Sequence, residues 1–119
     1  LAELARVLTA SVREIDVAAR YGGEEFLVIL PQTHFAGSLA VAERIWRDVA
    51  AHQFGIDGAD LRLTVSIGVS FFPNKSVTSP DRLVALADEA LYQAKRDGRN
   101  RICLNQQLSY VYRPGNSTP

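Results

Sequence analysis

The sequence of 119 residues contains a single cysteine and no methionine. Cys103 cannot form a disulfide within the chain, which excludes the disulfide-stapled scaffold typical of small secreted domains. The sequence also has only two histidines, and its cysteine and histidine residues do not show the spacing of zinc ligands. These absences favour a reducing, cytoplasmic location.

The sequence also lacks net charge, because thirteen basic residues balance thirteen acidic ones. This balance argues against a nucleic-acid partner, or an anionic membrane surface, bound through bulk charge. No apolar run approaches the roughly 18 residues that span a bilayer, and the N-terminus has no signal-peptide pattern. The chain begins at Leu1 inside an amphipathic helical pattern, so we expect it to be a piece of a longer protein.

Hydrophobic residues, 47% of the chain, suffice for one globular domain. Their periodicity changes along the chain between the spacing of helices and the alternation of strands. The expected elements are a helix over 1–14, strands over 17–21 and 26–30, a helix from a Thr33 cap to about 52, a strand over 61–71, a helix from a Ser79 cap to Gly98, and a strand over 102–104. This order predicts an α+β fold, with a sheet that carries helices on one or both faces.

Adjacent glycines, Gly22 and Gly23, separate the first two expected strands and predict a tight hairpin turn. Such a turn lets a phosphate or a nucleobase approach the backbone closely. Glu24 and Glu25 follow at once, and neighbouring strand residues point to opposite faces, so the two should differ in role. One carboxylate would ligate Mg²⁺, while the other orients substrate or supports that ligand. The alternative interpretation is an ordinary hairpin with two solvated glutamates.

A basic cluster follows the last helical pattern. Four basic residues minus one acidic residue leave a local charge of plus three over Lys95, Arg96, Asp97, Arg99 and Arg101. Arginine binds phosphate through bidentate hydrogen bonds, and lysine binds it as a point charge. The alternative interpretation is that these residues complement the negative end of the helix dipole.

Three segments together resemble one known family. The segment from Arg20 to Phe26, RYGGEEF, is similar to the signature loop of the GGDEF family in its GGEEF form. The segments 66–69 (SIGV) and 90–100 (ALYQAKRDGRN) also resemble family segments, in the family's order and at its spacing. Members of this family are diguanylate cyclases, which condense two GTP molecules into cyclic dimeric GMP (cyclic di-GMP) and release pyrophosphate.

The resemblance implies a ferredoxin-like, nucleotidyl-cyclase-like α+β fold, an antiparallel-type sheet with flanking helices. Family domains have further residues on the N-terminal side, which form a central strand with a metal-binding Asp and a helix that reads guanine. We therefore expect a truncated GGDEF domain over 1–105, which lacks the first strand and its helix, and a C-terminal tail over 106–119.

The resemblance also implies an active half-site. Glu24 is the implied metal ligand and possible base, and Glu25 the carboxylate that supports the metal or the substrate. The implied contacts to the nucleotide and its phosphates are Gly22, Gly23, Lys95 and Arg99. Mg²⁺ is the implied cofactor, with two ions in each half-site of the complete domain. Because one domain holds one GTP, the reaction implies a homodimer with facing half-sites.

A second implied site binds the product. On spacing alone, Arg13 and Asp16 form a surface ion pair worth well under about 1 kcal/mol. Family members carry such an RxxD pair five residues before the signature loop, the distance found here, and it inhibits the cyclase by binding cyclic di-GMP. The arginine would hold a phosphate or N7 and O6 of guanine, and the aspartate would accept from the guanine NH groups. Arg44 matches a position that often adds a second arginine.

The implied site is incomplete in this sequence. Glu24 alone is a poor magnesium site, so we expect the chain to be inactive although its longer parent, with an upstream sensory or regulatory domain, is a cyclase. Two other functions stay open, a non-catalytic receptor for cyclic di-GMP and a dimerisation module. The intact GGEEF loop argues against the receptor, and failure to bind both GTP and cyclic di-GMP would indicate the module.

Overall fold

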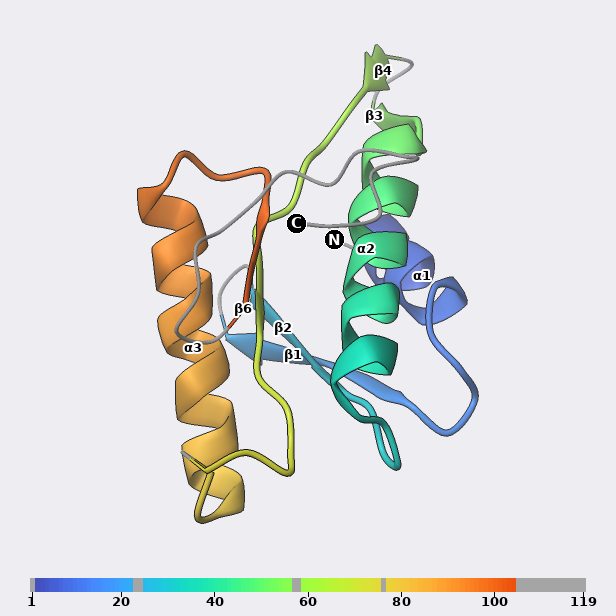
Figure 1. Ribbon diagram of the computed structural model, residues 1–119. Coiled ribbons are helices and arrows are strands. Elements are labelled where there is room, and N and C mark those ends of the chain that lie inside the picture. The colour runs from blue at the N-terminus through green and yellow to red at the C-terminus, as the bar shows by residue number, and fades with distance from the viewer. Residues whose placement is uncertain (1, 23–24, 57–58, 76, 105–119) are drawn as a thin grey trace.

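The computed structural model describes residues 2–22, 25–56, 59–75 and 77–104. Its elements are α1 (Ala2–Ala10), β1 (Val17–Gly22), β2 (Glu25–Ile29), α2 (Phe35–Ala51), β3 (Phe54–Ile56), β4 (Ala59–Leu61), β5 (Ile67–Val69), α3 (Pro80–Arg96) and β6 (Ile102–Leu104). This succession confirms the α+β class (Figure 1). Within the described ranges, no helix is long and apolar enough to cross a membrane. The expected tail, 106–119, lies outside them.

The parallel pair β5–β6 lies between α2 and α3 (Figure 1). Ile102 and Leu104 of β6 pack with Ala42 of α2 in one buried cluster. Cys103, between them, packs with Ala90 of α3 in another. Successive strand residues point to opposite faces, so this one short strand joins both helices to the sheet.

The antiparallel pair β1–β2 forms a hairpin beside α1 and α2. On its inner face, Phe26 packs against a core cluster that includes Leu8 of α1 and Val49 of α2. On its outer face, the paired residues Val17 and Ile29 are each 51% exposed. The hairpin is therefore anchored through one face only.

The strand expected over 61–71 is wrong in extent. Only β4 at its beginning and β5 in its middle are strands. Leu63 and Val65 do pack against the core, so the alternation correctly indicates a half-buried segment. A strand also needs a hydrogen-bonded neighbour, and residues 62–66 pair with no strand in the described part of the chain. The antiparallel pair β3–β4 is an element that the sequence pattern did not predict.

The helix expected over 1–14 ends earlier, at Ala10. The Ser11 hydroxyl donates to the carbonyl oxygen of Val7 at 2.7 Å and lies 3.0 Å from Asp48 Oδ2 on α2. Serine side chains that bond to nearby backbone compete with helix continuation. The early end frees the following residues for the turn that leads into β1.

Glycine at position 68 lets α3 lie directly on β5. An ideal Cβ placed on Gly68 would stand 2.2 Å from the backbone nitrogen of Leu91 and 2.3 Å from the carbonyl oxygen of Ala87. Both atoms belong to the backbone of α3, which cannot rotate aside as a side chain can. The absence of a side chain at this position therefore sets the distance between α3 and the sheet.

We expect Gly68→Ala to lower the free energy of unfolding by about 2 kcal/mol or more, because the added methyl group pushes α3 away from β5. Chemical denaturation followed by circular dichroism measures the loss. Gly55→Ala is the matched control, since a Cβ there meets nothing within 4 Å. Equal losses in the two variants would contradict the close contact.

Candidate active site

The hairpin carries the signature segment at its turn. The antiparallel ladder ends with Gly22 paired to Glu25. Gly22 is exposed, and an ideal Cβ on it would meet no atom within 4 Å, so a ligand can approach the backbone here. Gly23 and Glu24 lie outside the described residues, and their predicted roles stay predictions.

The α3 helix ends in the basic cluster. Lys95 lies in its last turn, as expected. The chain leaves the helix through three consecutive residues of positive φ, which are Gly98 at 126°, Arg99 at 65° and Asn100 at 52°. The amide of Arg99 donates to the carbonyl oxygen of Ala94 at 3.0 Å. Left-handed conformations are unfavourable for residues other than glycine, so this turn has a defined shape held by its hydrogen bonds.

One ion pair joins the hairpin to α3. The ammonium of Lys95 lies 3.1 Å from Glu25 Oε2, although 70 residues separate the two in sequence. The side chains are 34% and 41% exposed, and such a solvated pair contributes about 1 kcal/mol or less. The ion pair therefore matters mainly for position, because it holds the partly exposed ammonium of Lys95 beside the signature turn. Arg99, the other predicted phosphate ligand, is exposed on the turn after α3.

The described residues do not by themselves form a metal site. Among them, no group of three or more His, Cys, Asp and Glu side chains stands close enough to hold an ion. Glu25 is engaged with Lys95. The predicted magnesium ligand, Glu24, lies outside the described residues, so these residues give only part of the predicted set of metal ligands.

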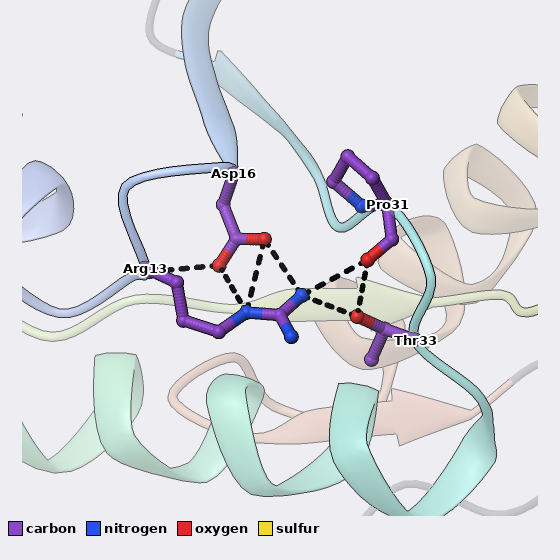
Figure 2. A network of polar contacts seen from close by, with 4 residues as sticks. All are labelled: Arg13, Asp16, Pro31 and Thr33. Atoms are coloured by element: carbon purple, nitrogen blue, oxygen red, sulfur yellow. Dashed lines mark hydrogen bonds and ion pairs between the residues drawn. The ribbon is translucent and has the colours of Figure 1, made fainter.

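A second polar cluster lies at the base of the hairpin, where β1 begins and β2 ends (Figure 2). Arg13 Nη2 donates to Asp16 Oδ1 at 2.8 Å, and Arg13 Nε donates to Oδ2 at 3.1 Å. The backbone amide of Arg13 also donates to Oδ2, at 2.8 Å. The Asp16 side chain is fully buried, whereas that of Arg13 is 43% exposed. The pair is therefore a bidentate, half-buried one, and not the solvated surface pair that spacing alone predicts.

The charges around Asp16 favour its ionised form. Hydrogen bonds from the Arg13 side chain hold the pKa of Asp16 below its ordinary value, against the opposing effect of burial. The charge of Arg44, on α2, lowers the pKa of Asp16 further. The same hydrogen bonds raise the pKa of Arg13. The structure thus brings the three residues predicted for the product site into one electrostatic cluster.

Thr33 also belongs to this cluster, and its predicted role as the cap of the second helix is wrong. The helix α2 begins after His34, which makes no side-chain capping bond. The Thr33 hydroxyl accepts a hydrogen bond from Arg13 Nη2 and donates to the carbonyl oxygen of Pro31 at 2.9 Å. No local pattern reveals this contact, because 20 residues separate Thr33 from Arg13 and only the hairpin brings them together.

We expect Asp16→Asn to lower the urea midpoint at pH 7, because an amide cannot accept both donors of the Arg13 fork. The folded-state pKa of Asp16 is depressed, so its stabilising effect is present above the unfolded-state pKa and is lost as pH falls through the folded value. The midpoints of variant and wild type should therefore converge well below pH 3.8. Asp88→Asn, at an exposed carboxylate on α3, is the control. A difference that persists at low pH would contradict this account.

The chain is similar to one known family and to several known proteins. The chain matches the family described as diguanylate cyclase, GGDEF domain, over residues 1–101. It is 43% identical over 106 residues to diguanylate cyclase A of Treponema denticola, an overlap of 89% of this chain and 28% of that protein. It is 46% identical over 104 residues to the response regulator PleD of Caulobacter vibrioides, an overlap of 86% of this chain and 23% of that protein. The chain therefore spans less than a third of the length of these curated relatives.

Solved structures confirm the expected fold. The GGDEF domain of YfiN (TpbB) from Pseudomonas aeruginosa matches with a TM-score of 0.80 and 31% identity, over 90% of this chain and 66% of that one. The GGDEF domain of DgcB from Caulobacter crescentus, solved in complex with c-di-GMP, matches with a TM-score of 0.73 and 30% identity, over 87% of this chain and 61% of that one. Because sequence and fold agree over most of its length, the chain belongs to the GGDEF family of diguanylate cyclase domains.

Proposed function

We propose that the chain forms the part of a cyclase domain that holds the GTP phosphates, and that its longer parent condenses two GTP molecules into cyclic di-GMP and pyrophosphate. The observation that carries this proposal is the 3.1 Å contact between Lys95 and Glu25, which joins the C-terminal end of α3 to the signature hairpin. Lysine binds phosphate as a point charge, and the backbone beside it is open at Gly22. These features suit an anionic nucleotide.

The reaction needs positioning and charge neutralisation from the protein. The 3′-hydroxyl of each GTP attacks the α-phosphorus of the other, so two P–O bonds form and two bonds to pyrophosphate break. Each hydroxyl proton would pass to a base, for which Glu24 is the proposed group. Lys95 and Arg99 would neutralise the β- and γ-phosphates that leave. Glu25 keeps Lys95 at the turn before the nucleotide arrives, and Lys95 then exchanges this carboxylate for phosphate oxygens. Gly22 and Gly23 would give the nucleotide access to the backbone.

A homodimer is the proposed working assembly. One domain that holds one GTP supplies half of the reactants, so the reacting groups meet only when two half-sites face each other. The partner is therefore a second copy of the same domain in antiparallel orientation.

Magnesium is the proposed cation of the complete site, with two ions in each half-site, because Mg²⁺ binds through one or two carboxylates together with substrate phosphates. Glu24 is the proposed ligand. Since the described donors are incomplete, we propose that the chain alone is inactive and that other residues of its parent complete the site. The proposed location is cytoplasmic, where Cys103, a buried cysteine, stays reduced.

The cluster of Arg13, Asp16 and Arg44 is the proposed product site. The exposed side of the Arg13 guanidinium offers donors to guanine or phosphate, whereas the Asp16 carboxylate, which is fully buried and bonded to Arg13, would hold that guanidinium in place. The predicted contact of Asp16 with guanine NH groups would require Arg13 to release this carboxylate when the ligand binds. The same cluster favours a second candidate function, a receptor that binds cyclic di-GMP without catalysis. A dimerisation module that binds neither nucleotide is the remaining alternative.

We expect Lys95→Gln to weaken GTP binding roughly tenfold to a hundredfold, because one charge-assisted contact to phosphate is lost. Isothermal titration of the chain with GTP and Mg²⁺ measures the affinity. Lys75→Gln, at an exposed lysine in the loop before α3, should leave it unchanged. Equal affinities for Lys95→Gln and wild type would contradict the phosphate role.

We expect Arg13→Ala to abolish binding of cyclic di-GMP, because it removes the guanidinium that faces the ligand. Titration calorimetry of the chain with cyclic di-GMP tests this, and Arg82→Ala, at an exposed arginine on α3, is the charge-matched control. Binding that survives in Arg13→Ala would contradict the product site.

A further inference from the structure

The guanidinium of Arg13 is held from two sides. Along one edge, Nε and Nη2 donate to the carboxylate of Asp16. Nη2 also donates to Thr33 Oγ1 and, at 3.1 Å, to the carbonyl oxygen of Pro31. Figure 2 shows the other terminal nitrogen, Nη1, directed away from all three partners. The donors of Nη1 are thus presented in a fixed plane.

We propose that Thr33 is a positioning residue of the cyclic di-GMP site, because its hydroxyl fixes the plane in which Arg13 presents Nη1 to the ligand. This inference rests on the proposed function of the Arg13, Asp16 and Arg44 cluster. Asp16 bonds to the guanidinium only along the edge formed by Nε and Nη2, so the plane of the guanidinium could still tilt about that edge. The contact with Thr33 lies on the far side of Nη2 and removes this freedom. Recognition of guanine or phosphate by arginine depends on such planar alignment.

Thr33 is itself fixed by two contacts. Its hydroxyl donates to the carbonyl oxygen of Pro31 at 2.9 Å, which orients the oxygen lone pairs toward Arg13. Its methyl group lies against Gly37 of α2, where an ideal Cβ would stand 2.9 Å from Thr33 Cγ2. The methyl therefore occupies space that exists only because position 37 is glycine. A β-branched side chain held at both branches has little rotamer freedom.

Thr33→Val tests the hydroxyl directly, because it keeps the shape and replaces the oxygen by a methyl group. In titration calorimetry with cyclic di-GMP, we expect this variant to bind roughly fivefold to tenfold more weakly than wild type. Thr33→Ser restores the hydroxyl and should bind within about twofold of wild type. Thr9→Val is the matched control, since the Thr9 hydroxyl donates to the carbonyl oxygen of Ala5 within α1, and should leave the affinity unchanged.

Gly37→Ala separates positioning from stability. Alanine is the better helix former, so the thermal midpoint of this variant should stay level or rise. The new Cβ displaces the Thr33 methyl, so the affinity for cyclic di-GMP should fall. If Thr33 had a purely structural role, the affinity for cyclic di-GMP would change in the same direction as the thermal midpoint. A lower affinity with an unchanged or higher midpoint supports a positioning role, and an unchanged affinity would contradict it.

The outcomes distinguish this inference from the function on which it rests. If Thr33→Val binds as tightly as wild type or more tightly, while Arg13→Ala does not bind, the role of Thr33 is overturned and the product site stands. If the wild-type chain does not bind cyclic di-GMP, the product site is overturned and the role of Thr33 with it.

Discussion

The backbone contact of α3 with β5 at Gly68 organises the rest of the molecule. Because a Cβ at this position would lie 2.2 Å from the nitrogen of Leu91, helix and strand meet with no side chain between them. Lys95 lies one helical turn beyond Leu91, so the same contact fixes its height above the sheet. At that height its ammonium lies 3.1 Å from Glu25 on the hairpin. The close packing at Gly68 thus contributes to the placement of Lys95 in the proposed phosphate site.

The β1–β2 hairpin links the two proposed sites. At its turn, Glu25 meets Lys95. At its base, Arg13 and Asp16 precede β1 while Thr33 follows β2 (Figure 2). The inner face of the hairpin packs against the core formed with α1 and α2, which holds both ends in place. Substrate and product would therefore bind to opposite ends of one hairpin.

Features that depend on neighbouring residues could be predicted from the sequence, and features that depend on distant ones could not. The cap of α3 was predictable, since Ser79 Oγ accepts from an amide three residues on, at 3.1 Å. The strand expected over 61–71 failed because strand pairing depends on a partner far along the chain. Motifs predicted Lys95 and Arg13 as site residues, but they did not predict the contact of Lys95 with the hairpin. The contact of Thr33 with Arg13 could not be predicted, because the sequence rule for helix caps gives Thr33 a local role. The hairpin instead places its hydroxyl beside Arg13, and α2 begins after His34.

Hydrogen exchange followed by mass spectrometry, with and without a non-hydrolysable GTP analogue and Mg²⁺, tests most directly whether the hairpin turn and the end of α3 form one nucleotide site. The account predicts that the analogue slows exchange together in peptides over residues 20–29 and 92–101, with little change in α1. Slowing in only one of the two segments, or at a surface remote from both, would contradict it.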